Sequence, residues 1–271
     1  GNSLKNSSSK KIVCGNGPFL FLVIKDEKPK YEKRNTLHGE DIVNVNIFDK
    51  KIEYRKITEG GQRIHASNSE KEANRNIGLI VNKSITDFNE ESKNIEQIYS
   101  DLIGSKKWES LEQVFTILNQ SLDYVVLRNF EELPTKYNKE FEGDIDILAE
   151  DKNEIELVTN AKKISPEKFG RRFKILINDE KVHLDLRYVG DGYFDEEWEK
   201  LILKEKIIKN KISIPDSKNH YYSLLYHYLI QKKSLTKNHL MKLHELGRNI
   251  DKNIEFNKIN NKEQFREKLE N

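Results

Sequence analysis

The chain has 271 residues, of which 36% are hydrophobic and 34% are charged. This composition excludes a chain that is disordered overall and suits one large or two modest globular domains with apolar cores. Its 47 lysines and arginines nearly balance its 45 aspartates and glutamates, which gives a formal charge of +2. No global positive field therefore points to nucleic acid or to a membrane surface as the partner.

A single cysteine, Cys14, excludes an intramolecular disulfide framework and is typical of a reducing cytoplasm. No apolar run reaches the ~18 residues of a membrane-spanning helix. The first residues, GNSLKNSSSKK, are polar and do not resemble a signal peptide. We therefore expect a cytoplasmic protein without a membrane span.

The composition divides the chain into a tail and three zones, and no internal repeat is visible. In the first zone, PFLFLVIKD (18–26) predicts a central strand, and residues 38–56 have the apolar spacing of a helix. Ser69 and Glu72 have the spacing of a capping box, which predicts the start of another helix. The expected parts are a flexible tail (1–11), a small α/β N-terminal domain (12–90), an α+β core (91–200) and a helical C-terminal subdomain (201–271).

The core alternates between helical and strand patterns. SLEQVFTILNQSL (110–122) predicts a helix that leads into the β-branched strand of DYVVLRNF, and GDIDILA predicts the next strand. After a helix over NEIELVTNAKKI, FKILINDEKVHLDLRYV predicts two strands joined by the turn Asn178-Asp179-Glu180. Farther along, 220–233 and 236–250 predict two helices, the second of which ends near Gly247.

Two aspartates, Asp144 and Asp146, interrupt the apolar strand GDIDILA. Asp is disfavoured in strands, and carboxylates at alternate positions point to the same face and repel each other. A third aspartate, Asp185, lies in HLDLR, where His183 and Arg187 occupy the alternate positions on either side of it. If the two strands are neighbours, three carboxylates converge, and this density of hard oxygen ligands suits Mg²⁺.

The alternative is that D-x-D marks only an edge strand with a solvated face. The order of helix, strand, D-x-D strand, helix and hairpin with a third aspartate favours the metal site, because several convergent features outweigh one motif. Two Mg²⁺ ions in such a site would activate the attacking oxygen and stabilise the leaving group of an in-line phosphoryl or nucleotidyl transfer.

The segments YVVLRNF, GDIDIL and HLDLRY resemble the polymerase-β-like nucleotidyltransferase superfamily, and LRNFEELP with GDIDIL resembles divergent bacterial members associated with surface-polysaccharide genes. The resemblance implies that Asp144 and Asp146 bind metal and that Asp185 assists the metal that activates the nucleophile. It implies an α+β fold, a nucleotidyltransferase-like mixed sheet preceded by the small α/β unit and followed by the helical subdomain. The implied partners are a nucleoside triphosphate or nucleotide sugar and a small-molecule or glycan acceptor.

One motif departs from the superfamily. Its members carry Gly-Ser or Gly-Gly after the first strand to hold the triphosphate, whereas this chain has Leu127-Arg128-Asn129. We expect Arg128 to hold phosphate with its planar fork and Asn129 to donate through its amide. The alternatives are that nucleotide binding is lost, or that Arg128 simply pairs with Glu131 or Glu132.

Other candidate residues lie outside these motifs. His227 and Lys232 are candidates for nucleotide contacts, although a solvated helix end explains the lysine as well. Arg187 is a candidate for substrate binding because it lies beside Asp185. His65, in IHASNS, lies at a predicted helix start where free amides bind anions, and a structural cap explains it equally.

Three functions are compatible with the sequence. The first is a Mg²⁺-dependent nucleotidyltransferase, or a related phosphosugar or phosphoryl transferase, that acts on a small molecule or glycan precursor in polysaccharide biosynthesis. The second is a catalytically inactive nucleotidyltransferase-like module that binds nucleotide or protein. The third is a toxin–antitoxin-type enzyme that modifies protein or tRNA. The lack of a dense basic patch counts against a nucleic-acid partner.

Overall fold

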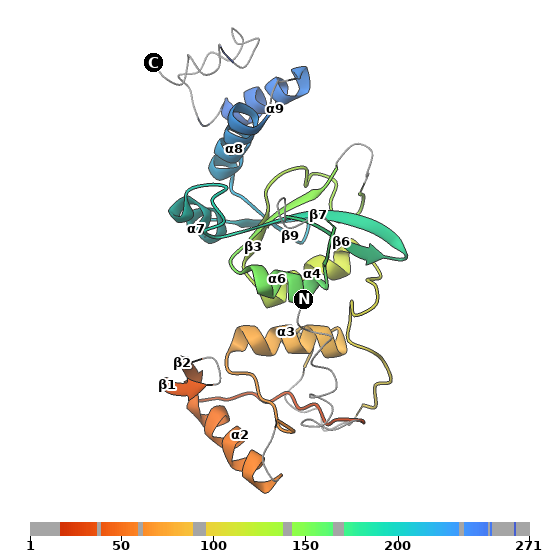
Figure 1. The fold of residues 1–271 in the computed structure, drawn as a ribbon, viewed down its shortest axis with the longest axis vertical. Coiled ribbons are helices and arrows are strands. Elements are labelled where there is room, and N and C mark those ends of the chain that lie inside the picture. The colour runs from red at the N-terminus through yellow and green to blue at the C-terminus, as the bar shows by residue number, and fades with distance from the viewer. Residues whose placement is uncertain are drawn as a thin grey trace. The chain divides into compact units, whose positions relative to one another are not determined.

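A computed structural model gives the fold of the chain (Figure 1). The chain divides into two compact units, Gly1–Ile98 and Tyr99–Asn271. The predicted tail, 1–11, lies outside the described residues. The structure describes residues 17–36, 39–58, 62–88, 96–137, 143–164, 171–232, 236–248, 250 and 263.

The first unit contains a β-hairpin that leads directly into a helix. Asn44 is the N-cap of that helix, and its side chain accepts the Asn46 N–H at 3.1 Å. The predicted cap at Ser69 is confirmed, because its hydroxyl accepts the Glu72 N–H at 3.2 Å. The elements are β1 (Tyr31–Thr36), β2 (Gly39–Asn44), α2 (Val45–Ile57), α3 (Glu70–Val81) and the short 3₁₀ helix η1 (Ile85–Asp87).

Two predictions for this unit are wrong. Residues 18–26, all of them described, form no strand, and their exposed large apolar side chains are Phe19, Leu20, Leu22 and Ile24. An apolar run becomes a central strand only where neighbouring strands pair with it, and the described sheet of this unit contains β1 and β2 alone. The helix expected over 38–56 begins only at Val45, because Gly39–Asn44 pairs with β1 instead.

The second unit is built on a five-stranded mixed sheet with strand order β3-β4-β7-β6-β5. Strand β4 runs parallel to β7, and the other neighbouring pairs are antiparallel. The predicted α+β class, the strand in GDIDILA and the hairpin turn at Asn178 are confirmed. The strands are β3 (Tyr124–Val126), β4 (Ile145–Ala149), β5 (Lys162–Lys163), β6 (Arg172–Ile177), β7 (Glu180–Tyr188), and a separate hairpin of β8 (Ile207–Lys209) and β9 (Ile212–Ile214).

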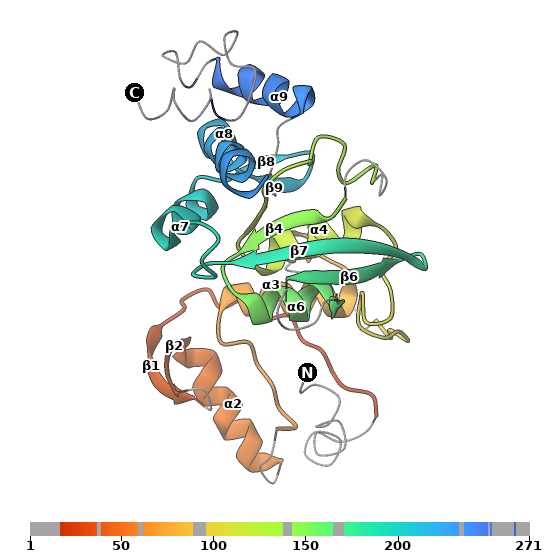
Figure 2. The same cartoon turned by 45° about the horizontal axis from the view of Figure 1, so that its top comes forward.

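The helices of the second unit agree with the predicted pattern with one exception. The helix expected over NEIELVTNAKKI (153–164) ends at Thr159, because Lys162 and Lys163 pair with β6 instead. Helices α4 and α6 lie side by side along the sheet (Figures 1 and 2), and α8 and α9 pack against each other around the buried Tyr221 and Leu243. None of the described helices is long and apolar enough to cross a membrane. The helices are α4 (Leu111–Ser121), α6 (Lys152–Thr159), α7 (Glu196–Lys204), α8 (Ser217–Tyr226), the π-helical segment η3 (His227–Gln231) and α9 (Lys237–Gly247).

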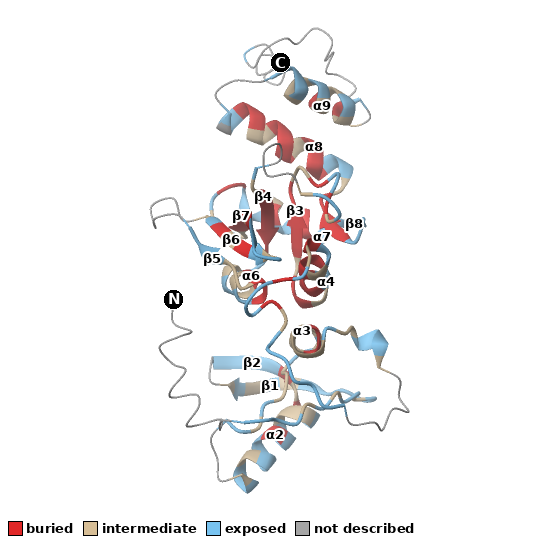
Figure 3. Cartoon of the chain, turned by 90° about the vertical axis from the view of Figure 1, so that its right-hand side faces the viewer, coloured by how far each residue is buried: buried red, intermediate tan, exposed pale blue. Residues whose placement is uncertain are grey.

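Burial on both faces fixes the orientation of β4. Leu148 packs with Val125 and with Ile202 of α7 in one apolar cluster. Because side chains alternate along a strand, Ile145 and Ile147 point to the opposite face, and both are buried. Figure 3 shows this burial over β3 and β4. The side chain of residue 146 therefore lies on the α7 face of the sheet.

The glycine at position 104 makes a close approach to a buried tryptophan. Gly104 has a φ of +70°, and a Cβ added there would lie 2.3 Å from Trp108 Cζ2. The Trp108 ring is 1% exposed, and its Nε1 donates to the Thr159 carbonyl at 3.0 Å. Gly143 has nearly the same φ, +68°, but an added Cβ would meet nothing within 4 Å. Alanine at both positions would therefore strain the backbone, but only alanine at 104 would also overlap a neighbouring side chain.

We predict that Gly104→Ala lowers the free energy of unfolding more than Gly143→Ala does. The strained backbone costs both variants about 1–2 kcal/mol, and overlap with Trp108 adds about 1–3 kcal/mol to the first alone. Denaturant titration followed by tryptophan fluorescence measures the difference, because both tryptophans, Trp108 and Trp198, lie in the second unit. Equal losses in the two variants would contradict the packing described for Trp108.

Candidate functional site

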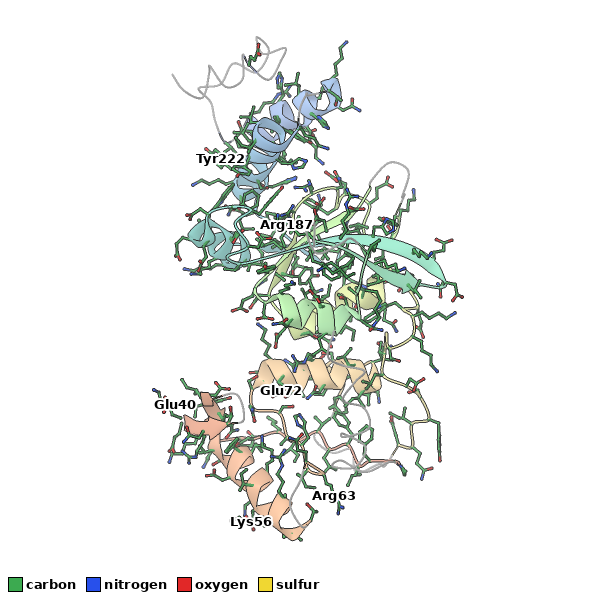
Figure 4. The ribbon with its side chains drawn as sticks, viewed as in Figure 1. Glu40, Lys56, Arg63, Glu72, Arg187 and Tyr222 are labelled. Carbon is green, nitrogen blue, oxygen red and sulfur yellow. The ribbon has the colours of Figure 1, made fainter. Side chains whose placement is uncertain are left out.

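Strands β4 and β7 bring two of the predicted aspartates opposite each other. In the parallel register Asp146 pairs with Asp185, and Leu148 pairs with Arg187. Paired positions point to the same face of a sheet, so these side chains share the α7 face. Arg187 is labelled on this strand in Figure 4. As the sequence predicted, Asp146 and Asp185 lie on adjacent strands.

Asp144 precedes β4 and contacts the β6–β7 hairpin. Its Oδ2 lies 3.3 Å from Arg172 Nε, and its Oδ1 lies 3.8 Å from His183 Nδ1. Both partners come from the face of the hairpin that also carries Asp185, because Arg172 pairs with Asp185 in the antiparallel register. Within the part of the chain that the structure describes, no three His, Cys, Asp or Glu side chains are grouped as metal ligands.

Arg128 is the direct partner of Asp146. Its Nη2 forms a close ion pair with Asp146 Oδ1, and its Nη1 donates to the Tyr193 hydroxyl at 3.2 Å. The two charged side chains are 11% and 10% exposed. Glu131, a partner considered for Arg128 from the sequence, pairs with Lys242 at 2.6 Å instead. Arg128 therefore points into the site.

Burial and charge act in opposite directions on this ion pair. Burial raises the pKa of the Asp146 carboxyl, and the Arg128 guanidinium opposes that rise. Burial alone lowers the pKa of Arg128, but the charge of Asp146 and the Tyr193 hydroxyl outweigh it, and the pKa of Arg128 is raised. The guanidinium is thus held in its charged form.

Asp185 is less completely neutralised than Asp146. Arg187 Nε lies 3.5 Å from Asp185 Oδ1, and this buried oxygen accepts no hydrogen bond from the described residues. Burial, and next the charge of Asp146, raises the pKa of Asp185 to about 6. A buried carboxylate oxygen with spare lone pairs, beside a second carboxylate, is a position where a cation is stabilised.

These donors fit Mg²⁺ chemically. Asp146 and Asp185 supply the hard oxygen ligands that Mg²⁺ prefers, and one or two carboxylates commonly suffice because waters and substrate phosphates complete the octahedron. Asp185 Oδ1 accepts no hydrogen bond from the described residues and so retains lone pairs for an ion. Asp146 and Asp185, which lie opposite each other on paired strands, would therefore hold the ion. Asp144 precedes β4 and lies toward Arg172 and His183 of the hairpin.

Tyr193 connects the two arginines of the site to the C-terminal helices. Its hydroxyl receives the Arg128 hydrogen bond and lies 3.3 Å from Nδ1 of His227, the first residue of η3. The Arg187 guanidinium carbon lies 3.9 Å from the centre of the Tyr193 ring, a cation–π contact. Tyr193 thus contacts both Arg128 and Arg187. The predicted residue His227 contacts the Tyr193 hydroxyl, which connects it to the site.

The remaining predicted residues differ in their relation to the site. Lys232 follows η3, and its positive charge opposes the rise in the pKa of Asp146. Asn129 has a left-handed backbone, with φ of 56°, which turns the chain directly after Arg128. His65 belongs to the first unit, where its Nε2 lies 3.3 Å from a glutamate of α3, and the N-cap of that helix is Ser69 rather than His65.

Arg172, Tyr193 and Asp191 belong to the site but were not predicted from the sequence. Asp191 Oδ2 lies 3.8 Å from Arg187 Nη1 and 3.7 Å from Arg171 Nε. A signal for Arg172 was present, because the turn at Asn178 sets the hairpin register, and counting back from it places Arg172 opposite Asp185. Tyr193 and Asp191 lie in the loop between β7 and α7. The path of such a loop depends on tertiary contacts that no local pattern predicts.

Comparisons with known proteins do not assign the chain to a family. No protein-family model matches it, and no curated protein or solved structure does.

The raised pKa of Asp185 makes stability depend on pH. The pKa rises from 3.8 to about 6 on folding, so the folded chain binds this proton more tightly than the unfolded chain. Protonation of Asp185 contributes fully to the free energy of unfolding below about pH 4, and this contribution is lost as the pH rises through about 6. In EDTA, Asp185→Asn should raise the free energy of unfolding near pH ~7 by about 1–3 kcal/mol and leave it nearly unchanged near pH ~4.

The matched control is Asp179→Asn, which removes an exposed carboxylate from the turn of the same hairpin. Its surface pair with Lys107 contributes little, so stability should change by less than about 0.5 kcal/mol at either pH. Thermal unfolding of both variants and the parent chain at the two pH values makes the comparison. A loss of stability in Asp185→Asn near neutral pH would show that its carboxylate is needed for folding.

Proposed function

We propose that the chain is a Mg²⁺-dependent nucleotidyltransferase, or a related phosphosugar or phosphoryl transferase. The observation that carries the proposal is the pair Asp146 and Asp185, opposite each other on parallel strands, with the buried Arg128 against it. The carboxylates offer ligands for Mg²⁺, and the guanidinium offers a two-point contact to phosphate. Phosphoryl-transfer chemistry uses both groups in one small volume.

Each residue of the site has a separate role in the proposed reaction. Mg²⁺ held by Asp146 and Asp185 would supply charge neutralisation and activation of the attacking oxygen. Arg128 binds a phosphate oxygen of the donor, and the Tyr193 hydroxyl orients its guanidinium. Arg187, held over the Tyr193 ring, keeps the Asp185 carboxylate in position. Placement and electrostatics supply most of the catalysis in such reactions.

The donor and acceptor follow from the same chemistry and from the resemblance of the motifs. A nucleoside triphosphate or nucleotide sugar provides the phosphate groups that Arg128 binds. A small-molecule or glycan precursor is proposed as the acceptor, since LRNFEELP with GDIDIL resembles members associated with surface-polysaccharide genes. The charge balance of the whole chain gives no support to a nucleic-acid acceptor.

One observation favours a second candidate, a catalytically inactive module that binds nucleotide or a protein. An arginine already lies against each of the three predicted aspartates, and the described residues contain no three-ligand metal cluster. Internal ion pairs neutralise carboxylates without any metal. The pairs are Asp144 with Arg172, Asp146 with Arg128, and Asp185 with Arg187.

A binding screen separates the two candidates. The full chain is titrated with the common nucleoside triphosphates and with several nucleotide sugars, in Mg²⁺ and in EDTA. We expect at least one ligand to bind more tightly in Mg²⁺, and Asp185→Asn to abolish that difference while Asp179→Asn retains it. Binding that is equal in Mg²⁺ and EDTA for every ligand would favour the inactive module.

Arg128→Lys tests the phosphate contact. An ammonium cannot reproduce the planar two-point contact of a guanidinium, so affinity for the ligand found in the screen should fall by about 1–3 kcal/mol, the range for hydrogen bonds to charged groups. Lys206→Gln is the control, because it removes another cation of the second unit that pairs with an aspartate, Asp123, which is not among the site residues. Calorimetric titration measures both; equal affinities would remove Arg128 from the binding site.

A further inference from the structure

We infer that Arg128 is an internal counter-ion that makes the binding of a divalent cation and of a polyphosphate depend on each other. The inference rests on the proposed function and concerns the regulation of that same site. The cation requires Asp146, which Arg128 now holds, and the phosphate requires Arg128, which Asp146 now holds. A cation therefore has to displace Arg128 from Asp146, and a phosphate has to displace Asp146 from Arg128.

Burial makes this exchange cooperative. The side chains of Arg128 and Asp146 are 11% and 10% exposed, so water cannot solvate either charge well once the pair is broken. Separating a buried pair is strongly unfavourable when one charge is left without a partner. A cation alone would leave the buried charge of Arg128 without a partner, and a polyanion alone would leave that of Asp146 without one. When both ligands bind, each buried charge exchanges one opposite charge for another.

The charges around the pair support the same conclusion. Around this pair, four aspartates lie against four arginines, so a lone cation or a lone polyanion meets little net charge of the opposite sign. Lys232 adds one further positive charge near Asp146. The four contacts are Asp144 with Arg172, Asp146 with Arg128, Asp185 with Arg187, and Asp191 with Arg171.

Tyr193 keeps Arg128 at the site during the exchange. The Arg128 Nη1 bond to the Tyr193 hydroxyl, at 3.2 Å, does not involve Asp146 and remains available when Asp146 binds a cation. Packing holds Tyr193 itself, because Arg187 lies 3.9 Å above its ring and the ring of Phe194 is 4.4 Å away. The guanidinium can therefore turn its second nitrogen from carboxylate to phosphate without leaving the site.

Calorimetry with inorganic tripolyphosphate and Mg²⁺ as probes tests the coupling in the full chain. Tripolyphosphate should bind about 5–150-fold more tightly in excess Mg²⁺ than in EDTA, the usual range for coupled sites. Simple attraction to arginines predicts the reverse, because Mg²⁺ reduces the charge of the free polyphosphate. Mg²⁺ alone should bind the parent chain weakly.

Arg128→Gln removes the counter-ion and should uncouple the two ligands. Mg²⁺ alone should bind this variant more tightly than it binds the parent chain, and the gain in tripolyphosphate affinity caused by Mg²⁺ should shrink. Arg128→Lys, which keeps the charge, should leave Mg²⁺ binding weak, and Lys206→Gln should behave as the parent chain does. Circular dichroism and tryptophan fluorescence establish that each variant is folded.

The outcomes distinguish this inference from the proposed function. If Mg²⁺ alone binds the parent chain as tightly as it binds Arg128→Gln, the coupling is refuted while the proposed function stands. The same holds if tripolyphosphate binds equally well in EDTA while a ligand of the nucleotide screen still binds more tightly in Mg²⁺. If no variant binds Mg²⁺ or tripolyphosphate in any combination, the proposed function fails together with the inference. Tighter Mg²⁺ binding by Arg128→Gln, with Arg128→Lys unchanged, supports the counter-ion role.

Discussion

The parallel pairing of β4 with β7 places Asp146 directly opposite Asp185, and the rest of the site follows from the need to neutralise that pair. The register is firmly set, because a slip of one residue would turn every side chain of β4 to the other face and bury Asp146 where Ile147 now packs. Arg128 reaches the pair because β3 ends beside it, where the Leu127 N–H donates to the Asp146 carbonyl at 2.9 Å.

The negative charge of this pair is not fully neutralised, and the excess lies on Asp185. Asp146 is matched by a buried guanidinium, whereas burial and the neighbouring carboxylate hold the pKa of Asp185 at about 6. A carboxylate in that state lowers the stability of the metal-free fold at neutral pH. Local conflicts of this kind are expected at functional or strained positions, and the electrostatic cost at Asp185 falls on a residue of the proposed Mg²⁺ site.

The sequence predicted the parts of this arrangement that depend on local patterns. Alternating apolar and polar residues predicted β4 and β7, the turn at Asn178 predicted the hairpin, and the capping residue Ser69 predicted the start of α3. It failed where pairing partners decide the outcome: 18–26 is apolar but is not a strand in the described sheet. The Arg128–Asp146 and Arg128–Tyr193 contacts join segments far apart in the chain, and no spacing rule predicts them.

We propose that the Asp146–Asp185 pair is a divalent-cation site at which Arg128 turns from the Asp146 carboxylate to phosphate while it stays bonded to Tyr193. Crystals grown with Mn²⁺ and tripolyphosphate, measured at a wavelength where manganese scatters anomalously, test it directly. We expect an anomalous peak between the carboxylates of Asp146 and Asp185, with the Arg128 guanidinium on a phosphate oxygen and still bonded to Tyr193. Absence of the peak at saturating Mn²⁺, with Arg128 still paired to Asp146, would contradict it.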